Sequence, residues 1–169
     1  MRVLFAGGTG FIGKTFLDYF GEMQAAKPIE LTVLSRDPDA FLRNNGDFAD
    51  DFGKNFKISR QSLPEITISG QFDAIIHGAE VPTSLDMAGG YAAHSAEVLQ
   101  SLLSLAGRSG TKRIVYLSSG AVYMLGKKLQ VPFEFVTDFP EATPDAGNYA
   151  YSKYMSERAL RRYSDQTGI

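Results

Sequence analysis

Three glycines spaced three residues apart follow the first apolar segment and constrain the fold more than any other feature of the chain. Residues 2–6 form a short apolar run that ends at Gly7, and Gly10 and Gly13 come before apolar residues resume at helical spacing. Glycine suits such points because it permits a tight turn, close approach of a pyrophosphate and tight packing of a helix on a strand. The helix start then offers free N–H groups to phosphates. The pattern predicts a strand, a glycine loop and a helix that bind a dinucleotide, with Gly7 and Gly10–Gly13, which include Phe11 and Ile12, as cofactor-binding residues.

The same stretch also matches the phosphate loop of nucleotide triphosphatases, through Gly8 and the run Gly13–Thr15. A triphosphatase needs an aspartate for Mg²⁺ at the end of another strand. The later predicted strands end instead in His77 and in Ser118–Ser119. Phe11 and Ile12 come directly after Gly10. Two apolar residues at this point fit a helix that packs on its sheet better than they fit a loop that wraps around phosphates. The sequence therefore favours a dinucleotide, with a triphosphate or a plain strand–turn–helix as alternatives.

The rest of the chain alternates between strand and helix patterns, which indicates a doubly wound parallel α/β sheet of the Rossmann type. The expected strand order is 3-2-1-4-5, with the cofactor across the carboxyl ends of the strands where the order reverses. The length of 169 residues suits one domain, so residues 1–169 are interpreted as an NAD(P)-binding domain. Further strands are expected at 30–35, 56–59, 73–77 and 113–118, with helices at 11–20, 88–107 and 149–163, and a weak helical pattern at 40–43.

Composition excludes several classes of function. Seventeen Lys and Arg against 19 Asp and Glu leave a net charge of −2, which argues against nucleic-acid binding. The chain has no cysteine and two histidines, so no metal centre is expected. No apolar run approaches the roughly 18 residues that a membrane helix needs. The apolar start is also too short for a signal-peptide core, so the expected location is the cytoplasm.

The end of the second strand bears on the choice of cofactor. In NAD-binding folds an acidic residue at this position holds the ribose 2′-hydroxyl, whereas an arginine accommodates a 2′-phosphate. Here the strand ends in Arg36, and Asp37 lies one residue beyond the usual register. The sequence favours NADP, with NAD possible. The alternative is that Arg36 is simply a solvated charge.

A Tyr-x-x-x-Lys pair, Tyr149 and Lys153, stands at the start of the last predicted helix, and Ser119 follows the fifth strand. With the glycine loop and the run Ile75–Ala79, these motifs occur in an order that resembles the extended short-chain dehydrogenase/reductase family. The similar members are of the NAD-dependent epimerase/dehydratase type and act on nucleotide sugars. The resemblance covers essentially the whole chain, and the ordered set is more specific than any one motif.

The resemblance implies roles for these residues that agree with elementary chemistry. A tyrosine hydroxyl titrates near 10 in water, and a nearby cation favours its ionised form. Tyr149 would exchange a proton with a substrate oxygen while hydride moves to or from the nicotinamide. Lys153 would be the cation and would bind the nicotinamide ribose, and Ser119 would donate a hydrogen bond to the same oxygen. By the same resemblance Ala79 borders the cofactor, whereas His77 is interpreted as a packed residue.

The chain departs from the family pattern at three points. Dehydratases of this type resemble one another in an Asp-Glu pair after the catalytic hydroxyl, where this chain has Gly120–Ala121, which argues against a 4,6-dehydratase. The acid after the third strand is replaced by Arg60–Ser62. The chain also ends after a helix, where the fold would next place a strand, so we expect the C-terminal strands and the substrate domain to be absent.

The sequence thus predicts the cofactor-binding portion of an NADP-dependent reductase or epimerase of nucleotide sugars. The alternative from another class is a non-catalytic dinucleotide sensor of the same fold. A homodimer through the helices at 88–107 and 149–163 is expected. The 169-residue chain by itself is expected to bind cofactor without efficient turnover, because residues that position the substrate would lie outside it.

Overall fold

The computed structural model describes residues 1–23, 29–79, 91–124 and 148–169. The chain divides into two compact units. The first unit contains residues 1–80, 100–117 and 169, and the second contains residues 81–99 and 118–168.

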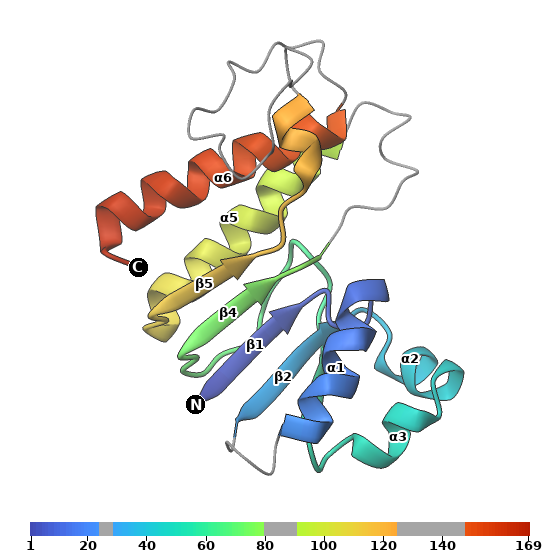
Figure 1. Ribbon diagram of the computed structural model, residues 1–169. Helices are drawn as coiled ribbons and strands as arrows, with labels where there is room; N and C mark the ends of the chain where they lie inside the picture. Colours follow the sequence, from blue (N-terminus) through green and yellow to red (C-terminus); the bar gives the residue numbers. More distant parts are fainter. Residues whose placement is uncertain (24–28, 80–90, 125–147) are drawn as a thin grey trace. The chain divides into compact units, whose positions relative to one another are not determined.

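A five-stranded parallel sheet forms the frame of the first unit (Figure 1). Its order is β3-β2-β1-β4-β5, which confirms the predicted order and the doubly wound Rossmann-type fold. The order reverses between β1 and β4, so the carboxyl ends of these two strands mark the switch point where this fold class binds its ligands. The strands are β1 (Arg2–Ala6), β2 (Glu30–Ser35), β3 (Phe56–Arg60), β4 (Ala74–His77) and β5 (Arg113–Tyr116).

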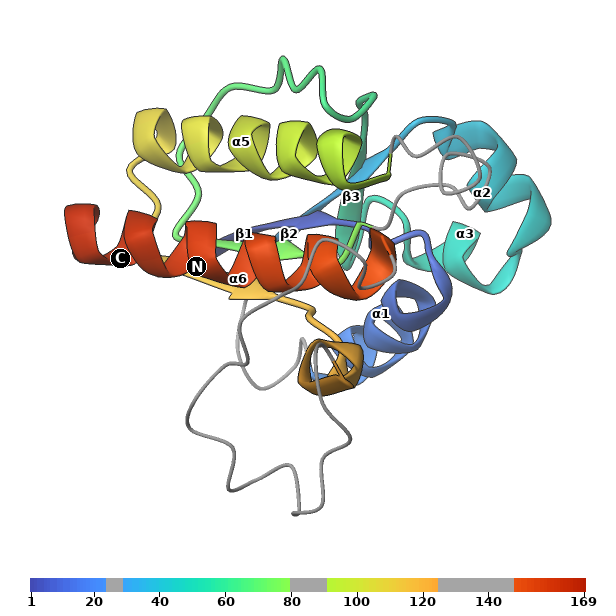
Figure 2. The ribbon, with the colours of Figure 1, turned by 90° about the horizontal axis from the view of Figure 1, so that it is seen from above.

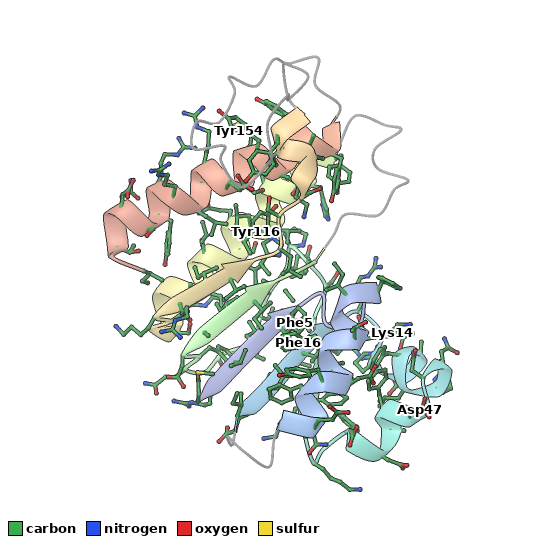
Figure 3. All side chains as sticks on the ribbon, viewed as in Figure 1. Phe5, Lys14, Phe16, Asp47, Tyr116 and Tyr154 are labelled. Atoms are coloured by element: carbon green, nitrogen blue, oxygen red, sulfur yellow. The ribbon has the colours of Figure 1, made fainter. Side chains whose placement is uncertain are left out.

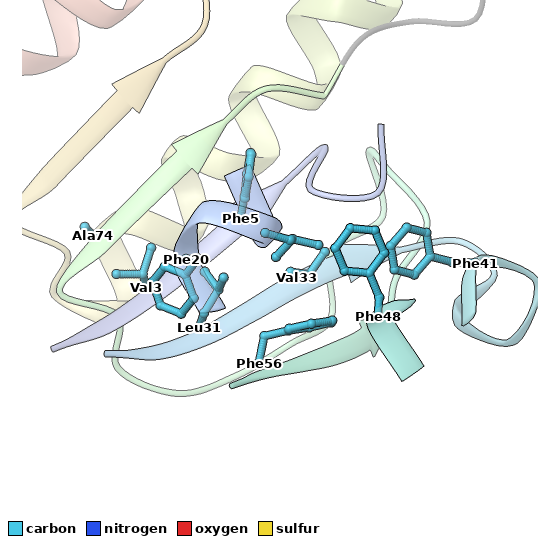
Figure 4. Packing of buried hydrophobic residues seen from close by; sticks show 10 residues of the cluster. Val3, Phe5, Phe20, Leu31, Val33, Phe41, Phe48, Phe56 and Ala74 are labelled. Carbon is cyan, nitrogen blue, oxygen red and sulfur yellow. The ribbon is translucent and has the colours of Figure 1, made fainter. Parts of the chain in front are cut away.

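Helix α1 (Phe11–Met23) lies on one face of the sheet, and the C-terminal half of α5 (Tyr91–Ser109) lies on the opposite face (Figure 2). Phe5 of β1 meets Phe16 of α1 edge to face, with ring centroids 5.3 Å apart (Figure 3). The core on this face, seen in Figure 4, consists mainly of Val3, Phe5, Leu17, Phe20, Leu31, Val33, Phe41, Phe48, Phe56 and Ala74.

The polar segment after β2 forms two short helices, where the sequence pattern indicated helix only at 40–43. They are α2 (Pro38–Asn44) and α3 (Asp47–Asp51). Phe41 and Phe48 are both buried and stack with ring centroids 5.5 Å apart. Two isolated aromatics, rather than an apolar stripe, therefore dock this segment, which is why periodicity missed α3.

The described part of the second unit contains the short helix η1 (Gly120–Met124), the long helix α6 (Asn148–Thr167) and the first half of α5. Val122 of η1 and Tyr154 of α6 form a small buried cluster, at 1% and 6% exposure. Ser118, which was expected to end the fifth strand, lies beyond β5 and belongs to this unit.

Candidate functional site

The glycine loop joins β1 to α1, and two of its glycines are required by close backbone contacts. Gly7 has φ +95°, and a Cβ atom there would lie 2.3 Å from the carbonyl carbon of Gly78. A Cβ atom on Gly13 would lie 2.4 Å from the carbonyl carbon of Gly8. Neither position has room for a side chain, so these glycines hold the loop close to the end of β4 and the helix close to the loop.

Gly10 is less crowded than Gly7 and Gly13. Among the described residues, a Cβ atom there would meet one atom within 4 Å, the Gly7 carbonyl oxygen at 3.3 Å. The Gly10 N–H donates to that oxygen at 3.0 Å, and the first helical bond runs from Lys14 N–H to the Gly10 carbonyl at 2.9 Å. The N–H groups of Phe11, Ile12 and Gly13 therefore have no partner within the helix.

Phe11 and Ile12 were expected to pack on the sheet, and this expectation is wrong. Their exposed fractions are 87% and 62%, and the helix contacts the sheet through Leu17 and Phe20 instead. The first turn of α1 thus presents two exposed apolar side chains and three N–H groups that have no hydrogen-bond partner among the described residues. An open glycine beside unpaired amides at a helix start fits a pyrophosphate, so the chain's residues fit a dinucleotide cofactor.

The position of Lys14 argues against the alternative of a triphosphatase phosphate loop. Lys14, labelled in Figure 3, donates from its Nζ to Asn45 Oδ1, next to the end of α2, at 3.4 Å. The adjacent strand β4 ends in His77, not in a carboxylate. In the described ranges, no group of three or more His, Cys, Asp or Glu is arranged to hold a metal ion.

The corner between β2 and α2 determines what Arg36 can do. Asp37 accepts the Ala40 N–H at 3.1 Å and caps α2, and this bond, with the Arg60 guanidinium, holds the pKa of Asp37 below its ordinary value. Arg60 forms an ion pair with Asp39 at 2.6 Å. The exposed Arg36 side chain forms no hydrogen bond or ion pair with any described residue. The Asp37 carboxylate at this corner is thus occupied by a structural hydrogen bond, whereas the Arg36 guanidinium has no such contact with the described residues.

Ala79 follows β4 at the switch point and lies beside the glycine loop. A Cβ atom on Gly7 would come within 2.4 Å of the Ala79 nitrogen. His77, the last residue of β4, is 3% exposed, and its ring lies 5.1 Å from the ring of Tyr116. The structure therefore brings Ala79 to the loop and packs His77 in the interior of the first unit.

In the second unit, Tyr149 and Lys153 lie one turn apart on α6. The Lys153 ammonium is 5.7 Å from the centroid of the Tyr149 ring. Lys153 is 5% exposed and Tyr149 is 38% exposed. Tyr91 of α5 meets the Tyr149 ring edge to face, with centroids 5.9 Å apart. A buried cation thus stands beside a tyrosine that remains accessible to a reactant.

Ser119 opens the turn that leads into η1. Its Oγ accepts the Ala121 N–H at 3.2 Å, and its carbonyl accepts the Val122 N–H at 3.2 Å. Because the Oγ acts as an acceptor in the turn, its hydroxyl hydrogen stays available to donate. Ser119 can therefore serve both the turn and a substrate oxygen.

Glu157 is a further residue of this site that the sequence patterns did not single out. It lies four residues after Lys153 on α6, and its Oε1 accepts the hydroxyl of Ser118. A third chemistry-bearing residue at helical spacing after Tyr149 and Lys153 was the available signal. Its position next to the Ser119 turn makes it relevant to the site.

Comparison with known proteins decides the family. A family model described as the NAD dependent epimerase/dehydratase family matches residues 3–169. The chain belongs to this family. The resemblance found in its motifs is therefore confirmed.

Solved structures of epimerases share the fold. A UDP-Glc/GlcNAc 4-epimerase from Campylobacter jejuni is 24% identical, with TM-score 0.74 over 99% of this chain and 50% of the epimerase. A UDP-N-acetylglucosamine 4-epimerase from Methanobrevibacter ruminantium is 22% identical, with TM-score 0.74 over 99% and 52%. A UDP-glucuronic acid 4-epimerase from Bacillus cereus, solved with NAD, is 19% identical, with TM-score 0.71 over 100% and 54%. The chain spans about half the length of these structures.

A relative of a different kind is a polyketide synthase–nonribosomal peptide synthetase from Aspergillus clavatus. It is 26% identical over 181 residues, which cover 99% of this chain and 4% of the synthetase.

Among the described helices, none is long and apolar enough to cross a bilayer.

Proposed function

We propose that this member of the epimerase/dehydratase family is an NADP-dependent epimerase or reductase of a nucleotide sugar. The observation that carries the proposal is the buried Lys153 ammonium beside the accessible Tyr149 ring. Three structural relatives are named as UDP-sugar 4-epimerases, which supports the substrate class. Residues 1–169 are proposed to form the cofactor-binding domain. The homodimer and the cytoplasmic location remain predictions.

The proposed chemistry assigns one task to each side chain. A bound nicotinamide would supply the group that accepts or returns hydride. Tyr149 Oη takes the proton of a sugar hydroxyl as the carbonyl forms and returns it in the reverse direction. Lys153 stabilises the ionised Tyr149 oxygen. The Ser119 hydroxyl donates to the sugar oxygen and holds it as its charge changes.

Product analysis tests the proposal. A form of the protein that also contains the substrate-positioning residues expected outside residues 1–169 is incubated with NADP(H) or NAD(H) and a panel of UDP- and dTDP-sugars. The sugars are then analysed by NMR. A stereoisomer at one carbinol carbon indicates an epimerase, and net reduction indicates a reductase. A dinucleotide that binds without changing any sugar would favour the non-catalytic sensor.

Gly10→Ala is expected to weaken cofactor binding without unfolding the protein. Among the described residues the new Cβ meets one oxygen, at 3.3 Å, so the loop has to shift by a few tenths of an ångström. The added methyl group would also obstruct the proposed approach of the pyrophosphate to the loop. We expect about a tenfold or larger rise in the Kd for NADP, the equivalent of losing one hydrogen bond to a charged group. Calorimetric titration measures the Kd and thermal unfolding measures stability. Gly46→Ala, at a position with nothing within 4 Å, is the control. An unchanged Kd would contradict this placement of the pyrophosphate.

Arg36→Ala is expected to abolish a preference for NADP. Because no described residue engages the Arg36 guanidinium, it is available to a 2′-phosphate. Its loss should weaken NADP binding by about 1–3 kcal/mol and leave NAD binding nearly unchanged. Parallel titrations of both cofactors measure this. Arg113→Ala removes an exposed arginine at the start of β5, the other end of the sheet, and should change neither affinity. Equal affinity of the unchanged protein for NAD and NADP would refute the role of Arg36.

A further inference from the structure

Glu157 holds a carboxylate in a position that the proposed chemistry does not use. Its Oε1 accepts the Ser118 hydroxyl, and its Oε2 is buried with no hydrogen-bond partner among the described residues. A buried carboxylate oxygen without a hydrogen-bond donor destabilises the folded state. The presence of Glu157 is therefore not explained by a gain in stability. It is explained better by the segment that its hydrogen-bonded oxygen, Oε1, holds in place.

The bonded oxygen reaches the segment that carries Ser119. Ser118 is the residue directly before Ser119, and the Ser118–Glu157 bond joins this point to α6. Three residues after Ser119, Val122 packs on Tyr154 of the same helix. Ser119 thus lies between a polar and an apolar attachment to α6. Tyr149 and Lys153 belong to that same helix.

We propose that Glu157 is a positioning residue: through Ser118 it fixes the Ser119 turn on α6, and so sets Ser119 in register with Tyr149 and Lys153. The catalytic consequence rests on the proposed function. The structural consequence does not, because it concerns only the order of the turn. One attachment through Val122 would leave the turn free to pivot, and the second attachment removes that freedom. A carboxylate suits this task because its hydrogen bond from a hydroxyl is charge-assisted.

Hydrogen exchange of the full protein tests the order of the turn. The amides of Ala121 and Val122 both donate to Ser119, so their exchange reports on it. We expect Glu157→Ala and Ser118→Ala each to raise exchange in a peptide covering 117–124 by about tenfold, and the double variant to add little. Glu157→Gln keeps an accepting oxygen and should retain most of the protection. Asp165→Ala, an exposed acid on the same helix, should have no effect.

Single-turnover kinetics tests the consequence for the site. With cofactor bound and a sugar from the panel, Glu157→Ala is expected to slow hydride transfer about tenfold without changing the Kd for the cofactor, and Glu157→Gln to restore the rate to within about threefold. A wild-type protein that processes no sugar would defeat the proposed function, and exchange at 117–124 would then decide the role of Glu157 alone. Unchanged exchange there in Glu157→Ala, or a rise that extends equally through β1 to β4, would overturn the proposal.

Discussion

Tyr149→Phe is expected to lower the rate of hydride transfer by about 10²–10⁴-fold, because it would remove the group that we propose moves the substrate proton. Its ring stays in place, so the contact with Tyr91 and the neighbouring Lys153 ammonium should persist. Cofactor affinity and the midpoint of thermal unfolding should therefore change little. The rate is measured in a single turnover of the full protein from the appearance of reduced nicotinamide at 340 nm.

Tyr151→Phe provides the matched control, because it removes a hydroxyl from the same helix two residues away. Its rate should equal that of the unchanged protein. If both variants turned over at the wild-type rate, Tyr149 would not be the proton carrier. If both lost activity to the same extent, the effect would belong to α6 as a whole rather than to one hydroxyl.

Gly7→Ala is expected to reduce the free energy of unfolding by about 2–6 kcal/mol, because strain and collision add. The residue has φ +95°, and its new Cβ would meet the Gly78 carbonyl carbon at 2.3 Å. Gly13→Ala, with an approach of 2.4 Å to the Gly8 carbonyl carbon, should cost about 1–3 kcal/mol or more. Urea unfolding followed by circular dichroism measures both.

Gly46→Ala is again the control, since its Cβ would meet nothing within 4 Å and its φ is −55°. With Gly10→Ala the four variants form a series in which two glycines act on folding, one on ligand binding and one on neither. Wild-type stability of Gly7→Ala and Gly13→Ala would show that the loop is not packed against β4 and α1 as described.

Strands β1 and β2 could be predicted because each is a short apolar run that is mostly buried in the sheet. The runs at 2–6 and 30–35 coincide with β1 and β2. The helix bounds were less accurate. The last helix begins at Asn148 and ends at Thr167, because polar residues that carry no periodic signal continue it beyond Tyr163. The first three residues of the predicted helix at 88–107 lie outside the described residues.

The sequence indicated which residue types form the candidate site, but it did not indicate which of their side chains are exposed and which are buried. Phe11 and Ile12 are apolar and stand at helical spacing, so pattern alone placed them on the sheet. They occupy the first turn of α1, ahead of the residues that reach the core, and are exposed instead. Glu157 escaped notice for the opposite reason. A glutamate on a helix is ordinarily solvated, and only the structure places its Oε2 out of solvent and its Oε1 on Ser118.

The corner at the end of β2 shows how structure sharpens a prediction that sequence leaves open. Asp37 was set aside because of its register, and the structure gives a physical reason, since its carboxylate caps α2. Whether Arg36 is a selector or a solvated charge is decided by ligand affinity, not by its position. The same holds for the choice between enzyme and sensor.

The most direct test of hydride transfer is the kinetic effect of deuterium at the reacting carbon of the sugar. A form of the protein that also contains the substrate-positioning residues expected outside residues 1–169 is loaded with oxidised NADP or NAD. It is mixed with a UDP- or dTDP-sugar labelled at one carbinol carbon, and absorbance at 340 nm is followed. Hydride transfer predicts a transient rise at 340 nm that the label slows, and that Tyr149→Phe nearly abolishes. Tight binding of the dinucleotide with no rise for any labelled or unlabelled sugar would contradict this account and leave a binding module without catalysis.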